Sequence, residues 1–397
     1  MNKILIIGAF DRFNYGDLLF PIIIEQQLKT YGHPLDIGYF GMIESDLSDL
    51  GGKPTQDIQA FYRACNANNE RANIIVAGGE AIAVTWNSLL VALNERYRLI
   101  RRYQHHLEKF IDLNKWAKRK LKGQTVLPFV FNKTDFKSVD HVLFNSLGGS
   151  EIPEQIFTKI EGLQQKLKNV DYFSVRDTIT RKNLKNKGVE TKLYPDSAIL
   201  MSKFYAIEHL DELVNIDVRH FVALKKGKYV FFQINRNHAK QKEEKIAALL
   251  NAIHHETGAD ICLCPIGKAS NHNDDEALQL IFPHLDGDAQ FFNDVTIWDI
   301  MYLIANAQCY IGTSLHGAIT AMSYAVPYVG INVKKLNSYL GTWGVENLQN
   351  VVAIESLYDQ YLKAIKVPKQ DLIESKNKQF AAIEESFNLM ATLLFRS

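Results

Sequence analysis

Small and polar residues follow an apolar run at the start of the sequence, where they could bind an anion or a sugar. Gly8 ends the run, and Asn14, Gly16 and Asp17 follow in the loop before an apolar stretch typical of a helix, with Pro21 expected in its first turn. Such a loop presents backbone N–H groups at a helix N-terminus. The three-glycine spacing of a dinucleotide site is missing. Asn14 could equally form a turn, and Asp17 could be a first-turn acid.

A second group of this kind follows the apolar run at residues 72 to 77. Gly78 and Gly79 come directly after the run, and Glu80 follows them. Paired glycines after a strand let the backbone turn tightly or approach a ligand closely. Glu80 is therefore a candidate proton acceptor, with an exposed acid after a glycine turn as the alternative.

The third group surrounds a histidine in the stretch CYIGTSLHGAITAMSYAVP, residues 309 to 327. The pattern predicts a strand that ends at Gly312, a turn of Thr313, Ser314 and Leu315, and a buried helix from about His316 and Gly317. Free N–H groups at such a helix start can hold phosphate or carboxylate. His316 is thus a candidate catalytic residue, whereas a role as a capping histidine is the structural alternative.

Short β-rich apolar runs alternate along the chain with segments long enough for crossover helices. This rhythm predicts an α/β fold with parallel sheets covered on both faces. At 397 residues with 47% hydrophobic residues, the chain is long enough for two domains. The predicted buried strands are residues 3 to 10, 72 to 79, 140 to 149, 171 to 177, 228 to 235, 259 to 267, 307 to 312 and 327 to 332.

A polar, weakly patterned stretch at residues 200 to 226 separates the two sets of strands. We therefore expect an N-terminal domain of residues 1 to 205 and a C-terminal domain of residues 206 to 397, with the boundary good to about ten residues. Ligands bind at the carboxyl ends of strands in such sheets. The three polar groups are thus expected to face one cleft between the domains.

Charge and composition exclude several classes of protein. Forty-five Lys and Arg against 44 Asp and Glu leave a net charge of +1, which gives no general reason to expect nucleic acid as a partner. No run approaches the roughly 18 apolar residues of a membrane span, so we expect a cytoplasmic protein. Cys262 and Cys264, two apart in a predicted strand, are interpreted as packed thiols rather than zinc ligands. We predict no metal and no cofactor.

One segment, residues 86 to 122, departs from the alternation because it is locally basic and has apolar residues at helical spacing. It predicts a long amphipathic helix or a helical hairpin inserted in the first domain. Its cationic face could simply be solvated. It could also contact anionic lipid head groups at the inner face of the membrane, or a lipid-linked, diphosphate-bearing acceptor. Its cations are Arg96, Arg98, Arg101, Arg102, Lys109, Lys115, Lys118, Arg119, Lys120 and Lys122.

Taken in order, these motifs resemble the polysaccharide pyruvyl transferase family. The resemblance covers most of the chain and rests on NYGD (14 to 17), GGE (78 to 80), SVRDTITRKNLKNKGV (174 to 189), YPDSAIL (194 to 200), the run 297 to 331 and KKLNSYLGTWG (334 to 344). It implies two Rossmann-like domains of the GT-B type. The chain departs from the family pattern at Ser314, where an arginine is common before the Leu-His pair, and at Glu80, where a small residue is common.

The resemblance also implies a reaction, in which phosphoenolpyruvate donates a pyruvyl group to a sugar of a cell-surface glycan or its lipid-linked precursor. His316 matches the motif histidine and would contact the donor phosphate or deliver a proton. Arg176 and Arg236 are the arginines expected to bind the anionic donor, although Arg176 could instead pair with Asp177. Asn14, Asp17 and Glu80 would face the acceptor from the first domain, leaving the second to bind the donor.

Two other functions are compatible with the same fold. One is a glycosyltransferase that uses a nucleotide sugar, with Arg236 and Lys334 or Lys335 on the diphosphate and Asp17 or Glu80 as the base. The other is a noncatalytic descendant that only binds glycans or partners.

Overall fold

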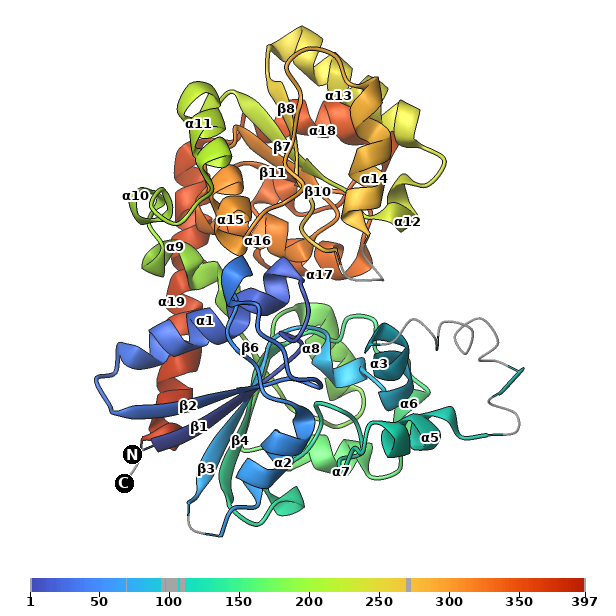
Figure 1. Ribbon diagram of the computed structural model, residues 1–397, viewed down its shortest axis with the longest axis vertical. Helices are drawn as coiled ribbons and strands as arrows, with labels where there is room; N and C mark the ends of the chain where they lie inside the picture. Colours follow the sequence, from blue (N-terminus) through green and yellow to red (C-terminus); the bar gives the residue numbers. More distant parts are fainter. Residues whose placement is uncertain are drawn as a thin grey trace.

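The computed structural model describes residues 2–68, 70–93, 97, 106–107, 111–268 and 273–395. Its two β-sheets lie in separate halves of the molecule (Figure 1). Every strand pair in both sheets is parallel, as crossover connections require. The expected α/β fold with two parallel sheets is therefore confirmed.

The first sheet has six strands in the order β2-β1-β3-β4-β5-β6. Its central strand β3 is buried at every position, because helices cover both faces. The strands are β1 (Asn2–Ile7), β2 (Leu35–Phe40), β3 (Ala72–Ala77), β4 (Val139–Leu147), β5 (Tyr172–Val175) and β6 (Lys192–Leu193). The helices of this half are α1 (Tyr15–Lys29), α2 (Ile58–Cys65), α3 (Trp86–Leu93), α5 (Leu113–Lys120), α6 (Ile156–Lys159), α7 (Leu163–Lys168) and α8 (Thr178–Lys185).

The second sheet has five strands in the order β11-β10-β7-β8-β9. They are β7 (Tyr229–Gln233), β8 (Asp260–Leu263), β9 (Gln290–Phe291), β10 (Cys309–Gly312) and β11 (Tyr328–Gly330). Three short helices lead into this half: α9 (Met201–Phe204), α10 (Ile207–Leu210) and α11 (Ile216–Lys225). Its own helices are α12 (Arg236–Ala239), α13 (Glu243–Thr257), α14 (Asp274–Ile281), α15 (Ile297–Ala305), α16 (Leu315–Ser323), α17 (Lys334–Trp343) and α18 (Leu357–Ala364).

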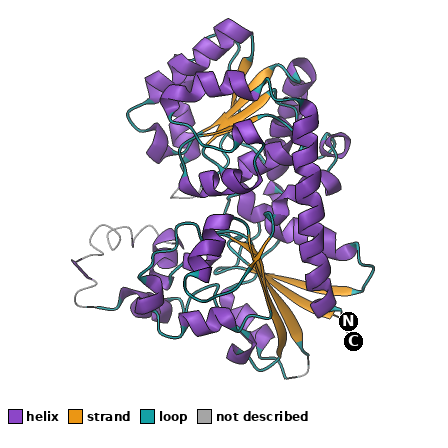
Figure 2. Ribbon diagram, turned by 180° about the vertical axis from the view of Figure 1, so that it is seen from behind, coloured by secondary structure: helices purple, strands orange, loops and turns teal. Residues whose placement is uncertain are grey.

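The last helix, α19 (Lys369–Leu394), returns from the second half to the first. Figure 2 shows it running along both halves, and it ends beside the first sheet. Tyr172 of β5 shares a hydrogen bond of 2.7 Å with Ser386, and Tyr194 donates one of 2.9 Å to Glu385. Strands β1 to β6 thus precede residue 205 and β7 to β11 follow it, but α19 packs on both halves.

Helix α1 also connects the two halves, and nearly every side of it is buried. Its apolar residues belong to one core cluster that contains side chains of both sheets, and a helix that is apolar all round is typical of such a position. The hydroxyl of Tyr15 pairs with that of Thr320 on α16 at 2.8 Å. The helix begins at Tyr15, so Pro21 lies beyond the first turn and not within it as expected. The shared core fixes α1 against α16, and these two helices carry Asp17 and His316.

Candidate functional site

A cavity of about 370 Å³ lies between the two sheets and is lined from both. Its size suits a small organic ligand. The lining residues predicted from sequence are Asn14, Asp17, Gly78, Gly79, Glu80, Arg176, Thr313, Ser314, Leu315, His316 and Lys335. The strand-end groups from the two domains therefore do face one cavity.

The loop that carries Asn14 closes one side of the cavity by contacting the second domain directly. Asn14 forms an antiparallel bridge with Gly267, and the backbone N–H of Tyr15 donates to the carbonyl of Ile266 at 3.1 Å. The start of α1 is consequently held against the loop that follows β8. This contact sets the distance between the walls of the cavity at that side.

His316 lies in the first turn of α16, which Ser314 caps by accepting a hydrogen bond from the N–H of Gly317. Its ring packs edge-on against Phe20 with centroids 5.2 Å apart. The ring also lies so close to Gly16 that a Cβ atom there would be 1.8 Å from Nδ1. Gly16 is therefore needed for close approach of the imidazole, which explains the glycine before Asp17.

An acidic partner lies behind the imidazole. Oδ2 of Asp196 is 3.5 Å from Nε2 of His316, and Nε2 has no hydrogen bond within the described part of the chain. Asp196 is fully buried and accepts the N–H of Ala198. Burial would raise its pKa, but His316 and Arg176 hold the pKa of Asp196 below its usual range. The buried Asp196 carboxylate therefore lies within ion-pair distance of the His316 ring.

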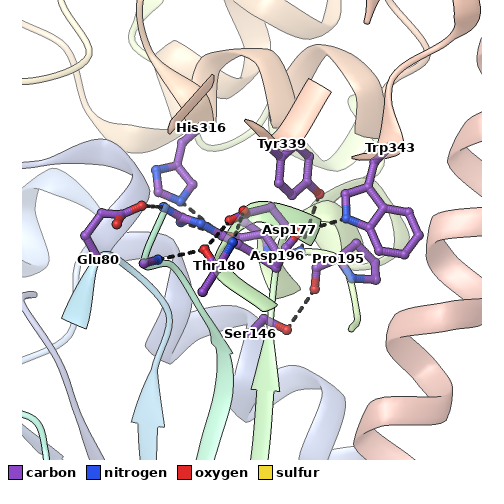
Figure 3. A network of polar contacts seen from close by, with 12 residues as sticks. Glu80, Ser146, Asp177, Thr180, Pro195, Asp196, His316, Tyr339 and Trp343 are labelled. Atoms are coloured by element: carbon purple, nitrogen blue, oxygen red, sulfur yellow. Dashed lines mark hydrogen bonds and ion pairs between the residues drawn. The ribbon is translucent and has the colours of Figure 1, made fainter. Parts of the chain in front are cut away.

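Arg176 connects Glu80 and Asp196, two acids of the polar network in Figure 3. Nη1 donates to Asp196 at 3.0 Å, and Nη2 donates to Glu80 at 2.7 Å. Burial opposes its charge, yet the acids Glu80, Asp196 and Asp177 raise the pKa of Arg176. Both ends of the guanidinium are thus occupied. Arg176 and Glu80 border the cavity as a pair and not as a free cation and a free base.

The SVRD motif also connects the domains. Asp177, which the sequence left as an alternative partner of Arg176, instead caps α8 by accepting the N–H and hydroxyl of Thr180. It accepts a third hydrogen bond from Ser338 of α17, and the indole of Trp343 donates to the carbonyl of Arg176 at 2.8 Å. The motif is therefore a structural joint between α8 and α17.

Asp17 lines the cavity and, within the described residues, forms no ion pair with an arginine. Its carboxylate accepts the side-chain amide of Asn14 at 2.9 Å. Burial raises its pKa, while the positive charges of His316, Arg12, Lys335 and Arg176 oppose that shift. A carboxyl group at a cavity wall whose pKa is raised by burial is a candidate for proton transfer.

Gly78 and Gly79 both adopt positive φ, at 55° and 70°. A side chain at Gly78 would overlap the ring of Phe20, whereas Gly79 faces open space apart from Asp17. Gly78 is needed for packing, and Gly79 leaves room for a ligand next to Asp17.

Four residues of the site were not predicted from the sequence. Asp196 lies within YPDSAIL, a motif that the resemblance includes but whose aspartate carried no local sign of a partner. Arg12 lines the cavity from the loop after β1, and its only ion pair within the described residues is with Asp11 at 3.4 Å. Gln233 and Asp274 line the opposite wall. In the sequence, the only indication of these residues is a polar residue placed between a predicted strand and a predicted helix.

Gln233 fixes the loop that precedes His316. Its Oε1 accepts the N–H groups of Thr313 and Ser314, each at 3.0 Å, and its Nε2 donates to Asp274 at 2.8 Å. The N–H groups of Thr313 and Ser314 are therefore satisfied within the protein, which leaves only those further along α16 for a ligand.

Some predicted site residues are not brought into the cavity. Arg236 pairs with Glu243 on α13 at 2.6 Å and is absent from the described lining. Gly16 and Gly317 lie just behind it, where Gly16 admits His316 and Gly317 admits Tyr310. The expected pairing of Arg236 with a donor anion therefore has no support in its position.

The basic segment borders the cavity where it is described. Helices α3 and α5 pack on each other, and Ala92 of α3 lines the cavity. Arg96, Arg98, Arg101, Arg102 and Lys109 lie outside the described residues. Among the helices that are described, none is long and apolar enough to cross a membrane. The described residues also hold no group of three or more His, Cys, Asp and Glu side chains arranged for a metal ion.

Substituting Gly16 tests the contact with His316. Gly16→Ala is expected to lower stability by about 1 to 3 kcal/mol, because the new Cβ atom displaces a packed imidazole. In a His316→Ala background the cost should disappear, since alanine favours a helix over glycine by up to about 1 kcal/mol. Urea unfolding of the four proteins in this cycle measures the coupling. Equal costs in both backgrounds would show that the ring does not sit against Gly16.

The chain matches a known sequence family and also resembles solved structures in fold. A family model described as polysaccharide pyruvyl transferase matches residues 14–335. No curated protein matches the chain.

Several solved structures share the fold at low sequence identity. UDP-GlcNAc 2-epimerase of Methanocaldococcus jannaschii, in complex with UDP-GlcNAc and UDP, superposes with a TM-score of 0.57 at 13% identity, over 98% of this chain and 99% of that one. The Neisseria meningitidis enzyme bound to UDP-GlcNAc gives 0.58 at 9% identity over 100% of both chains. A UDP-forming trehalose-phosphate synthase from Burkholderia xenovorans gives 0.52 at 12%, over 99% of both. These likenesses confirm the expected GT-B-like fold.

Proposed function

Because the family model covers residues 14–335, the chain belongs to the polysaccharide pyruvyl transferase family, and we propose that it transfers a pyruvyl group from phosphoenolpyruvate to a sugar. The acceptor would be a cell-surface glycan or its lipid-linked precursor. The proposed setting is exopolysaccharide or other cell-envelope synthesis in the cytoplasm, at the inner face of the membrane. Ala92 of the basic segment lines the cavity, and cations of this segment would suit an acceptor that carries an anionic lipid diphosphate.

One observation carries the proposal: a histidine backed by a buried acid lies in a cavity with two cations that have no strong partner of their own. His316 is the histidine and Asp196 the acid. In the described part of the chain, Arg12 has only a 3.4 Å ion pair with Asp11, and Lys335 has no ion pair. Phosphoenolpyruvate carries a phosphate and a carboxylate, so it needs cations that are not already neutralised.

The bonds and protons of the proposed reaction balance between the donor and the acceptor. The donor's methylene carbon takes a proton, an acceptor hydroxyl bonds to its central carbon, and the C–O bond to phosphate breaks with its electron pair going to phosphate. A second hydroxyl closes the ketal. The two acceptor hydroxyl groups lose two protons. One of them balances the proton gained by the new methyl group, and the other leaves on phosphate. His316, held by Asp196, is suited to deliver the methylene proton or to contact the phosphate.

The cations divide into two classes. Arg176 is occupied by Asp196 and Glu80 and would shape the cavity rather than bind the donor. Arg12 and Lys335 approach from opposite domains, and both act on the pKa of Asp17, so they converge on one region. We assign the donor's anionic groups to that region. Arg12 thereby supplies a cation that the chain lacks at Ser314.

Glycosyl transfer from a nucleotide sugar is the second candidate. It is favoured by the small number of cations on the second-domain wall, where Lys335 is the one lysine among the described lining residues. The UDP-GlcNAc complexes of structures with this fold are compatible with it. In that case Asp17 would serve as the base and Lys335 would contact the diphosphate.

Ligand titration with thermal unfolding separates the two. A ligand that binds only the native state at 100 times its Kd stabilises that state by about 2.7 kcal/mol. We expect phosphoenolpyruvate to raise Tm, and Arg12→Gln and Lys335→Gln each to weaken its binding about tenfold, as loss of one charged contact does. Arg236→Gln is the matched control and should bind normally.

Phosphate release with a glycan acceptor then tests the reaction itself. Stabilisation by nucleotide sugars alone would assign glycosyl transfer instead. Stabilisation by neither donor, with glycans still bound, would leave a glycan-binding protein. Weak binding by the Arg236 variant together with normal binding by the Arg12 variant would overturn the assignment of the anion site.

A further inference from the structure

Asp274 is a buried acid on the second-domain wall for which the proposed reaction above names no role. It is the first residue of α14 and only 1% exposed, yet it lines the cavity. Its Oδ2 accepts three hydrogen bonds, from the N–H groups of Ile266 (3.0 Å) and Gly267 (2.8 Å) and from Nε2 of Gln233 (2.8 Å). Three donors on one oxygen fix the plane and direction of the carboxyl group.

The other oxygen of Asp274 has no such partner. Oδ1 is buried and makes no hydrogen bond within the described residues. A buried acceptor left unpaired is costly, so such groups usually meet a ligand or ordered water. The held oxygen and the free oxygen together make a preorganised acceptor at the cavity wall.

The charge around Asp274 selects the kind of ligand. A carboxylate repels phosphate and carboxylate groups, and Asp275 follows it on the same helix turn. The donor anion is therefore assigned to the cations Arg12 and Lys335, which both act on the pKa of Asp17. A neutral O–H group fits a carboxylate oxygen, and sugars present such groups in pairs.

We propose that Oδ1 of Asp274 binds a hydroxyl group of the sugar acceptor and takes up its proton. This step rests on the proposed pyruvyl transfer: the O–H bond breaks as the oxygen bonds to the donor's central carbon, and the proton passes to Asp274 and then to solvent. The electron pair of the O–H bond forms the new C–O bond.

Two further observations agree with this role. Burial raises the pKa of Asp274 to about 7, while its hydrogen bonds from Gly267, Gln233 and Ile266 limit the shift, so the group can both lose and gain a proton near neutral pH. Gln233 connects Asp274 to Thr313 and Ser314, which lead into His316. One side chain therefore positions both the acid behind the hydroxyl and the loop of the histidine.

The decisive variant is Asp274→Asn. The amide oxygen can keep the three hydrogen bonds to Oδ2, while the amide nitrogen replaces Oδ1 with a donor that cannot accept a proton. Asp275→Asn is the matched control, because it makes the same change one residue away. Methyl glycosides of galactose, mannose and N-acetylglucosamine serve as probes, with binding measured by ligand-detected NMR and turnover by phosphate release from phosphoenolpyruvate.

We expect Asp274→Asn to weaken glycoside binding about tenfold and to lower turnover about 100-fold, within the usual range for loss of a general base. Binding of phosphoenolpyruvate should not change, and Asp275→Asn should match the wild type. If the asparagine variant does not fold, Asp274→Glu keeps the charge but moves the carboxylate by one methylene, and it should lose turnover in the same way.

Three results would overturn the assignment: no glycoside binding by the wild type with or without phosphoenolpyruvate, unchanged glycoside binding in both Asp274 variants, or equal losses in Asp275→Asn. Failure of the wild type to bind phosphoenolpyruvate would count against pyruvyl transfer alone. The glycoside measurements would then still decide whether Asp274 binds a sugar hydroxyl.

Discussion

Replacing His316 with alanine is expected to lower turnover by about 10²- to 10⁴-fold, the usual contribution of a positioned acid or base. The physical reason is the arrangement around the ring. Asp196 lies 3.5 Å behind Nε2, Gly16 and Phe20 hold the ring plane, and the side chain is 12% exposed, toward the cavity. Phosphate release from phosphoenolpyruvate with a verified acceptor measures the effect.

The asparagine variant separates two roles for the histidine. His316→Asn keeps hydrogen-bonding ability but cannot donate a titratable proton. Near-normal turnover would indicate that His316 contacts the donor anion, whereas a full loss would indicate proton transfer. Stability serves as the control, and it should change far less than activity, because a polar side chain at a cavity wall supports little apolar packing. Wild-type turnover in His316→Ala would leave the residue as a helix-start packing group.

The buried strands of both sheets, including the edge strand β11, could be predicted from the sequence, but the other three edge strands could not. Continuous apolar runs identified β1, β3, β4, β5, β7, β8, β10 and β11. Strand β2 is only partly buried along most of its length, and β6 and β9 have two residues each. Such edge strands carry no apolar run, because one side of them faces solvent or a loop.

The position at which α19 packs could also not be predicted from the sequence. Its composition indicates a helix, but nothing in its own residues says which sheet it covers. The answer depends on partners far away along the chain, such as Tyr172 with Ser386 and Tyr31, which donates to Asn388 at 2.7 Å. Contacts of this kind are set by the tertiary fold and leave no periodic signal.

The candidate site divides in the same way. Asp17, Glu80 and His316 could be predicted, because each follows a strand end and parallel strands bring such ends to one edge. The partners could not be predicted. Asp196 behind His316, Gln233 beneath the loop and Asp274 on the far wall are joined only through space, and Arg236 was chosen on local position although Glu243 neutralises it. The spacing of the motifs therefore predicted residues that line the cavity, but it did not predict the buried residues that orient them.

Removing Arg176 is expected to have the largest effect on stability. Arg176→Met should cost about 3 to 5 kcal/mol in the free energy of unfolding at pH 7, because it leaves a buried charge without its partner. Asp196 is the carboxylate that suffers most, since it is fully buried, while Glu80 is partly exposed. Arg236→Met is the control, and its single, more exposed pair with Glu243 should contribute less than about 1 kcal/mol.

The pH dependence of that cost provides an independent check. In the wild type the pKa of Asp196 is lowered, so its ionised form stabilises the fold above the unfolded pKa of about 3.9, and this contribution is lost only as pH falls through the lower folded value. Without Arg176, His316 and the N–H of Ala198 still oppose the effect of burial, but we expect burial to prevail and to raise that pKa. The variant should therefore lose stability as pH rises from about 4 to 7. Urea unfolding at both pH values should therefore show the deficit of Arg176→Met shrinking in acid. Protonation removes the cost of a buried carboxylate that has lost its partner, but it does not restore lost packing. A deficit in stability that stays constant with pH would therefore assign the cost to lost packing of the arginine stem.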